Sequence, residues 1–244
     1  MQKNSKKYIN NKKIFILGAS SDIGYEVVKK FLDDGYFVIG HYHTNKKKLS
    51  KIKDANLSLI KFNLKDINKF EKFIRKNKKL TSVSNFLSLT GYQNPSSIYN
   101  FTIKDFYDHI NVNYLSNIIF LRNSIEKMIK GNYGRILLTS SIGTKFGGGI
   151  NTFVYSISKF MNEFFPNQFR KINSQNILVN TLQIGLTNTK LIYKDKSKNL
   201  EERVKLIPTK RMASPKEVAI YIKDLFNEEK KLITNQIINI SGGE

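Results

Sequence analysis

The chain has 244 residues, no cysteine, and 41 lysine and arginine residues against 19 aspartate and glutamate, which gives a formal net charge of +22. The lack of cysteine excludes disulfides, thiolate metal sites and a cysteine nucleophile. No apolar run is close to the length of about 18–20 residues that a membrane-spanning helix needs. The run at residues 14–17 is too short for the core of a secretion signal, so the expected location is the cytoplasm.

The basic charge first suggests a nucleic-acid partner. However, only six of the 41 basic residues are arginine, whose forked guanidinium is preferred at phosphate and base contacts. The lysines are spread from Lys3 to Lys231 rather than gathered on one element. This pattern favours a solvated, lysine-rich surface. We therefore expect no specific nucleic-acid partner and no membrane partner, only nonspecific binding of polyanions at low salt.

Predicted strands and helices alternate along the chain after a basic polar tail, residues 1–12. Apolar runs predict strands at residues 14–17, 36–39, 57–62, 83–89, 134–138, 177–182 and 236–240. Apolar residues at helical spacing predict helices at residues 23–32, 67–75, 103–129, 155–172 with a kink at Pro166, and 215–226. The alternation, without linker or repeat, predicts a single α/β domain, residues 13–244. Its doubly wound parallel sheet has about seven strands and helices on both faces.

The first predicted strand is followed by Gly-Ala-Ser-Ser-Asp-Ile-Gly, residues 18–24. A glycine at the end of a buried strand permits a tight turn, and a second glycine lets the next helix begin close to the strand. The N–H groups and the dipole of that helix then face a pyrophosphate. Ordinary strand–helix turns also contain two glycines, so the segment alone leaves both interpretations open.

Tyr155 and Lys159 lie four residues apart and therefore on one face of a predicted helix. A nearby ammonium stabilises a phenolate, which lowers the pKa of tyrosine from its ordinary value of about 10. Ser140 and Ser141 end the preceding strand, where a hydroxyl can bond a substrate oxygen. A Tyr-x-x-x-Lys pair alone is more often a solvated helix face. Its position after a strand ending in serine, in a nucleotide-type sheet, favours a catalytic pair.

Together these segments resemble the short-chain dehydrogenase/reductase family in its compact form, with a Rossmann-like sheet, and the resemblance covers residues 14–243. The matching segments occur in family order: residues 18–24, Asn113, the Ser140-Ser141 pair, Tyr155 with Lys159, residues 180–185 with Thr189, residues 234–236 and residues 241–243. Within the family, the motif order is most similar to that of the 3-oxoacyl-acyl-carrier-protein reductases.

The resemblance implies a hydride transfer between a nicotinamide dinucleotide and a carbonyl or alcohol, without a metal. Tyr155 would be the general acid, and Lys159 would lower its pKa and bond the nicotinamide ribose. Ser141, rather than Ser140, would orient the carbonyl, and Asn113 would hold a water that links Lys159 to solvent. The residues expected to bind the cofactor are Gly18, Ser20, Ser21, Asp22, Ile23, Gly24, His43, Thr44, Asn45, Asn63, Leu64, Gly91, Tyr155, Lys159, Ile184, Gly185, Thr187 and Thr189.

The second predicted strand lacks the terminal carboxylate that binds the ribose 2′-hydroxyl in NAD enzymes of this architecture. It continues as Gly-His-Tyr-His-Thr-Asn, residues 40–45, and then three lysines. The His-Tyr-His triplet is similar to that of pteridine reductases. By this likeness His43, Thr44 and Asn45 would hold a 2′-phosphate, which favours NADP(H) over NAD(H). The alternative is a plain polar loop with a lysine run.

The chain departs from the family pattern in four places. Asp22 replaces the middle glycine of the first turn, and Ser-Leu-Thr-Gly at residues 88–91 replaces Asn-Asn-Ala-Gly. Asn63 stands in place of an aspartate and Ile184 in place of a proline. The carboxylate of Asp22 could cap the following helix and compete with phosphate, or point away. These changes leave every residue expected to handle protons in place.

The expected function is an NADPH-dependent reductase of carbonyls, or the reverse oxidation, similar to 3-oxoacyl-acyl-carrier-protein reductases. The expected substrate loop, residues 186–210, is rich in lysine, which suits an anionic substrate such as an acyl-carrier thioester. An oxidoreductase of a sugar or nucleotide-sugar pathway is an alternative. A catalytically silent homologue that binds nucleotide or protein is an alternative of another class. The resemblance also implies a homodimer or homotetramer.

Overall fold

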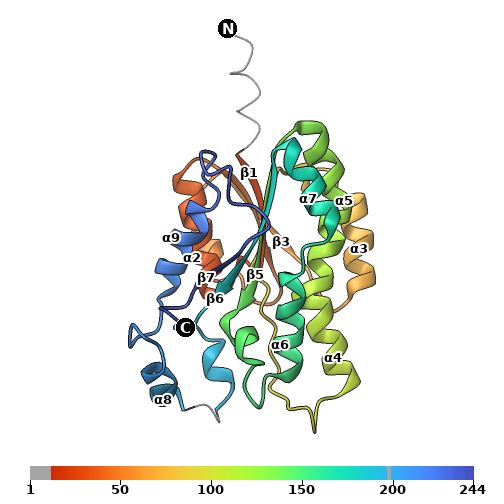
Figure 1. Cartoon of the computed structure of the whole chain (residues 1–244). Coiled ribbons are helices and arrows are strands. Elements are labelled where there is room, and N and C mark those ends of the chain that lie inside the picture. Colours follow the sequence, from red (N-terminus) through yellow and green to blue (C-terminus); the bar gives the residue numbers. More distant parts are fainter. Residues whose placement is uncertain (1–11, 197–198) are drawn as a thin grey trace.

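The structure, a computed structural model, describes residues 12–196 and 199–244; the expected tail, apart from Lys12, lies outside the described residues. Seven parallel strands form one sheet in the order β3-β2-β1-β4-β5-β6-β7 (Figure 1). They are β1 (Lys13–Leu17), β2 (Phe37–Tyr42), β3 (Leu57–Lys61), β4 (Asn85–Ser88), β5 (Gly134–Ser141), β6 (Ile177–Ile184) and β7 (Ile237–Ile240). The predicted parallel α/β sheet of seven strands is confirmed.

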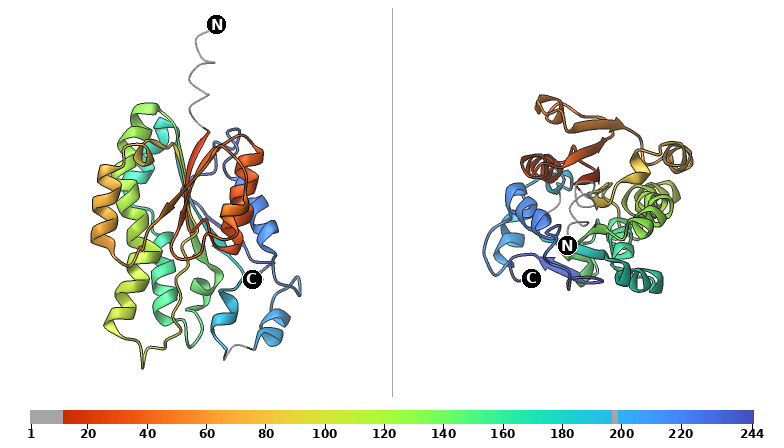
Figure 2. Two further views of the ribbon diagram at one scale, coloured as in Figure 1. Left: turned by 180° about the vertical axis from the view of Figure 1, so that it is seen from behind. Right: turned by 90° about the horizontal axis from the view of Figure 1, so that it is seen from above.

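Helices cover both faces of this sheet, as Figures 1 and 2 show. On one face lie α2 (Asp22–Asp33) and α9 (Pro215–Asp224), and on the other α3 (Ile67–Lys76), α4 (Ile103–Ile110), α5 (Ser116–Gly131), α6 (Phe153–Phe160) and α7 (Asn167–Ile172). The short α8 (Leu200–Lys205) follows β6 within the expected substrate loop. None of the helices in the described residues is both long and apolar enough to span a membrane.

The central strand β1 is buried on both sides, because its side chains alternate between two apolar cores. Ile14 and Ile16 pack with α2 and α9, whereas Phe15 and Leu17 pack with α3 and α5. The ring of Phe15 lies 4.9 Å, centroid to centroid, from that of Phe120 in α5. This double burial explains why β1 appears in the sequence as an uninterrupted apolar run.

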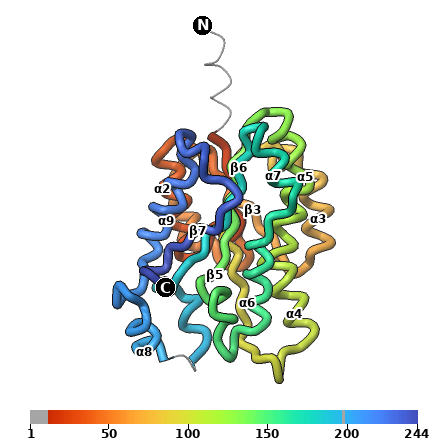
Figure 3. Tube along the Cα trace, viewed as in Figure 1, coloured from red at the N-terminus to blue at the C-terminus, as the bar shows by residue number. Residues whose placement is uncertain are grey.

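Two predicted helices are divided in the structure. The helix expected at residues 103–129 is interrupted by a π-helical turn, Asn111–Leu115, between α4 and α5. The helix expected at residues 155–172 is not kinked but broken: a 3₁₀ turn, Met161–Glu163, follows α6, and Pro166 has extended backbone angles before α7 (Figure 3). Proline offers no N–H to continue the helical ladder and disfavours helical angles at the residue before it.

The strand order reverses between β1 and β4, which lie side by side with Leu17 opposite Ser88. In sheets of this type, the loops at the carboxyl ends of the strands separate at such a point and leave a crevice for a ligand. The turn after β1, the segment after β4 and the end of β5 therefore meet at one edge of the sheet, where the expected site residues lie.

Candidate active site

The turn between β1 and α2 depends on its two glycines. Gly18 has φ of +78°, and a Cβ there would lie 2.7 Å from the carbonyl oxygen of Leu89. A Cβ on Gly24 would lie 2.5 Å from the carbonyl oxygen of Gly18. Larger residues would therefore push the helix away from the strand, so the start of α2 approaches β4 closely only with glycine at both positions.

The start of α2 presents free donors to the crevice. Ser21 caps the helix by accepting a hydrogen bond from the N–H of Gly24 at 3.0 Å. The N–H groups of Asp22 and Ile23 have no protein acceptor within residues 12–196 and 199–244. Unpaired N–H groups at the positive end of a twelve-residue helix fit the phosphates of a dinucleotide.

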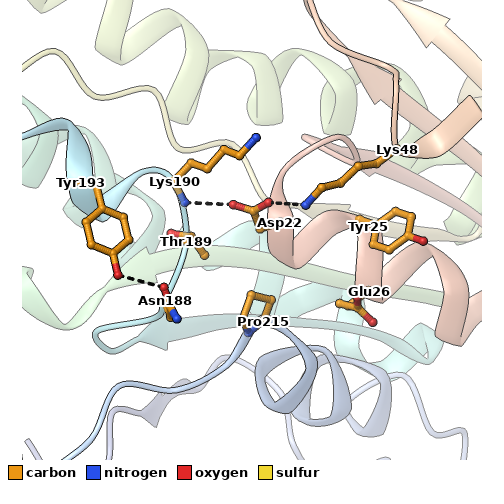
Figure 4. A pocket seen from close by; sticks show the side chains of 9 residues that line it. All are labelled: Asp22, Tyr25, Glu26, Lys48, Asn188, Thr189, Lys190, Tyr193 and Pro215. Carbon is orange, nitrogen blue, oxygen red and sulfur yellow. Dashed lines mark hydrogen bonds and ion pairs between the residues drawn. The ribbon is translucent and has the colours of Figure 1, made fainter.

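The carboxylate of Asp22 does not cap α2 but points away from the helix (Figure 4). It accepts hydrogen bonds from Lys48 Nζ at 2.8 Å and from the backbone N–H of Lys190 at 2.9 Å. Burial raises the pKa of Asp22, but the bonds from Lys190 and Lys48 outweigh it and hold the pKa below its ordinary value. Asp22 therefore ties together the first turn of α2, the loop after β2 and the loop after β6.

A pocket of about 350 Å³ opens beside this carboxylate. It does not include the residues expected to be catalytic. It is lined by Asp22, Tyr25, Glu26, Lys48, Asn188, Thr189, Lys190, Tyr193 and Pro215 (Figure 4).

At the end of β5, the structure brings the side chains of Ser141 and Tyr155 together. Burial raises the pKa of Tyr155 to about 12, and the neighbouring Ser141 hydroxyl acts in the opposite direction. Desolvation dominates this pKa, and the expected lowering of it by Lys159 stays a prediction. The phenol of Tyr155 is consequently protonated near neutral pH.

Lys159 lies one helical turn further along α6 and is 3% exposed. Its ammonium donates to the carbonyl oxygen of Thr90 at 2.9 Å and to Thr139 Oγ1 at 3.2 Å. Burial lowers the pKa of Lys159 to about 7, and the charge of Glu163 acts against that decrease. The Ser-Leu-Thr-Gly segment that departs from the family pattern thus supplies, through Thr90, an acceptor for this lysine.

Asn113 lies in the π-helical turn and is fully buried. Its side-chain N–H groups donate to the carbonyl of Tyr92 and to Ser158 Oγ, both at 2.9 Å. The backbone carbonyl of Asn113 accepts hydrogen bonds from the side-chain amides of Asn117, at 3.0 Å, and Asn162, at 2.9 Å. With these bonds Asn113 braces α6 against the segment after β4. Its expected role of holding a water stays a prediction.

The remaining residues expected to bind a cofactor lie in or next to the connections at the carboxyl ends of β1 to β6. The exposed ones among them follow β2 and β3: His43, Thr44, Asn45 and Asn63. Leu64 is 4% exposed and belongs to the core. After β6, Gly185 packs closely on the C-terminal segment, since a Cβ there would lie 2.5 Å from Ser241 Cα.

Two residues that sequence analysis did not assign also support the site. His41, buried in β2, accepts from the N–H of Gly18 through Nδ1 at 3.3 Å, and its Nε2 bonds the carbonyl of Phe62 at 3.0 Å. Glu163 lies one turn beyond Lys159 and bonds the side chain of Ser140. His41 could have been found in the sequence as a polar residue in an otherwise apolar strand. Glu163 could have been found by its spacing of four residues from Lys159, which places both on one helix face.

A glycine turn lies at the reversal of the parallel sheet, serine ends β5, and tyrosine and lysine follow on α6; this arrangement fits a dinucleotide-dependent oxidoreductase. The chain matches the short chain dehydrogenase family over residues 12–200 and belongs to that family. This confirms the resemblance found in the sequence, and the protein is an NAD(P)-dependent enzyme of the dehydrogenase/reductase class.

Known proteins similar to the chain over nearly its whole length carry several names. A 3-oxoacyl-[acyl-carrier-protein] reductase FabG of Buchnera aphidicola is 29% identical over 241 residues, covering 96% of this chain and 98% of the relative. A 3alpha-hydroxysteroid dehydrogenase of Mediterraneibacter gnavus is 24% identical and covers 96% and 97%. Among solved structures, a 3-oxoacyl (acyl-carrier-protein) reductase of Agrobacterium tumefaciens with NADP bound superposes with a TM-score of 0.84 at 20% identity, covering 96% and 95%.

Proposed function

We propose that this protein is an NADP(H)-dependent reductase that converts the carbonyl of a 3-oxoacyl thioester to an alcohol. The observation that carries the proposal is the placement of Ser141, at the end of β5, beside Tyr155 of α6, with the Lys159 ammonium buried one turn away. The full-length similarity to proteins named 3-oxoacyl-[acyl-carrier-protein] reductase supports this substrate class.

NADP(H) is favoured over NAD(H). Residues 43–48 after β2 are exposed, contain three lysines and include no carboxylate that would repel a 2′-phosphate. The solved relative with NADP bound supports the same choice. We propose that His43, Thr44 and Asn45 contact the 2′-phosphate, and that the N-terminus of α2 holds the pyrophosphate.

The chain's own residues control the carbonyl oxygen, while the reduced nicotinamide, when bound, supplies the hydride to the carbon. Tyr155 carries its proton near neutral pH and donates it to the oxygen, so hydride and proton together give the alcohol. Ser141, which lies beside the same phenol, orients that oxygen. The Lys159 ammonium stabilises the phenolate that remains after the proton has left.

The test is the activity and cofactor binding of Tyr155→Phe and Ser141→Ala. With a 3-oxobutanoyl thioester and NADPH, Tyr155→Phe should lose about 10²–10⁴-fold in kcat, the usual contribution of general acid catalysis. NADPH binding, followed by fluorescence, should remain. Tyr99→Phe, which alters a tyrosine that is 95% exposed in the segment before α4, is the control and should keep full activity.

Two outcomes would contradict the proposal. Failure of the unmodified protein to bind NADPH or NADH would favour the alternative of a silent scaffold. Reduction of keto-sugars or their nucleotide esters, with no turnover of thioesters, would favour a sugar-pathway oxidoreductase. We further propose that the protein acts in the cytoplasm and as a homo-oligomer.

A further inference from the structure

A half-buried carboxylate, that of Glu163, lies next to the proposed catalytic residues Ser141 and Lys159. Glu163 lies in the 3₁₀ turn that follows α6, four residues after Lys159. One oxygen, Oε1, accepts hydrogen bonds from Ser140 Oγ at 2.5 Å, from Thr144 Oγ1 at 2.6 Å and from Gln183 Nε2 at 3.0 Å. These donors come from β5, from the turn after it and from β6, so a single oxygen joins three segments of the chain.

All three segments surround Ser141. Ser140 is its neighbour on β5 and pairs in register with Gln183 of β6. Thr144 lies in the 3₁₀ turn that Ser141 caps, and its Oγ1 is also 2.7 Å from the carbonyl oxygen of Ser141. The position of the serine hydroxyl therefore depends on an anchor that lies on the neighbouring helical segment.

Glu163 also lies one helical turn beyond Lys159, and its charge raises the pKa of Lys159 against the effect of burial. The strands and loops beside the ammonium contribute only neutral groups, the carbonyl of Thr90 and the hydroxyl of Thr139. Tyr155 lies one turn before Lys159 on the same helix. On α4, the ring of the buried His109 bonds the carbonyl of Asp105 and the N–H of Asn94.

We propose that Glu163 is a positioning residue of the reductase: its negative charge keeps the buried Lys159 protonated, and its hydrogen bonds fix the strand end that presents Ser141. The charge of Glu163 matters for the protonation of Lys159 because the ammonium is only 3% exposed and is therefore poorly solvated by water. Its two hydrogen-bond acceptors are neutral, so a nearby negative charge favours the protonated form. Only the activity test below rests on the proposed function; the titration test does not.

The charge is tested with Glu163→Gln, which keeps the size and an acceptor oxygen. The titration of Lys159 is followed by NMR on protein with ¹³C-labelled lysine, and its signal is assigned by its loss in Lys159→Met. We expect the apparent pKa of Lys159 to fall by about one unit or more when the nearby opposite charge is removed. Glu71→Gln, at a partly buried glutamate of α3 paired with Arg75 and Arg122, is the matched control and should leave the signal unchanged.

The activity test uses the same variants with NADPH and a 3-oxobutanoyl thioester. Since Lys159 is active as the ammonium, Glu163→Gln should move the basic limb of the kcat profile to lower pH, with NADPH affinity unchanged. Glu163→Ala, which removes the hydrogen bonds as well, should lower kcat further across the whole range. An unchanged Lys159 titration in Glu163→Gln overturns the proposal, whether or not the protein reduces this substrate. A loss of thermal stability without a shift in the titration shows a purely structural role and overturns it as well.

Discussion

A single buried histidine connects the glycine turn to the sheet. His41 is 3% exposed and spans the N–H of Gly18 and the carbonyl of Phe62, so the ring is held neutral with its proton on Nε2. Burial lowers the pKa of His41 to about 4, from 6.5 in the unfolded chain. Between pH 6.5 and about pH 4, His41 is therefore protonated in the unfolded chain but neutral in the folded protein. The free energy of unfolding consequently decreases as the pH falls through this range.

We expect the free energy of unfolding to decrease by up to about 3 kcal/mol between pH 7 and pH 4 on account of His41 alone. His41→Gln, which cannot titrate but can still accept and donate, should remove this part of the pH dependence. Urea denaturation at a series of pH values measures the effect. The same change at the exposed His43 is the control, and an identical profile in His41→Gln and the unmodified protein would contradict the assignment.

The proposed catalytic residues could be predicted because each is carried by a short segment. Tyr155 and Lys159 share one helix face, and Ser141 ends the strand before it. The residues that hold them could not be found in this way. Thr90 reaches Lys159 from 69 residues away, and Asn113 bonds Ser158 across 45 residues. Such contacts depend on strand order and helix packing, which leave no local pattern.

At the scale of helices, sequence periodicity predicted which segments are helical but not where they are interrupted. The π-helical turn at Asn111–Leu115 keeps the apolar pattern of α4 and α5, so periodicity does not show it. There the carbonyl of Asn113 accepts side-chain amides from Asn117 and Asn162. The break at Pro166 had a local cause, but the amount of bending depended on α7 packing Phe169 and Ile172 into the core.

The first turn of α2 carries a negative charge where the pyrophosphate is expected. We predict that Asp22→Asn lowers the dissociation constant for NADPH about 3–10-fold, because the repulsion disappears while the amide oxygen can still accept from Lys190. The loss of the exposed ion pair with Lys48 costs little by comparison. Fluorescence titration at low and high salt measures the change, which should shrink as salt screens the charge.

The matched control for this prediction is Glu26→Gln. Glu26 lies one turn further along α2 and lines the same pocket, but it does not bond the loop that contains Lys190 (Figure 4). Its replacement should leave NADPH affinity nearly unchanged. Weaker binding in Asp22→Asn would instead mean that the tie between the loops matters more than the charge.

At the scale of the whole molecule, the alternation of strands and helices was enough to predict a parallel sheet covered on both faces, since crossover connections require it. The strand order with its reversal between β1 and β4 was not predicted from the pattern, although it places the site. Nor does composition show which exposed side chains gather on one side. Four large apolar side chains of α4, α6 and the segment after α6 are at least 60% exposed: Ile103, Tyr107, Phe160 and Phe164.

We predict that this apolar surface is buried between copies of the chain, as the homo-oligomer implied by the family resemblance requires, because exposed patches of this kind mark association sites. Light scattering after gel filtration should give at least twice the chain mass of 28.2 kDa. The double change Ile103→Glu and Phe160→Glu should raise the dissociation constant about tenfold or more, since it places charges in a dry contact. Leu232→Glu, on an exposed loop before β7, should leave the mass unchanged. A monomer of the unmodified protein at micromolar concentration would contradict the prediction.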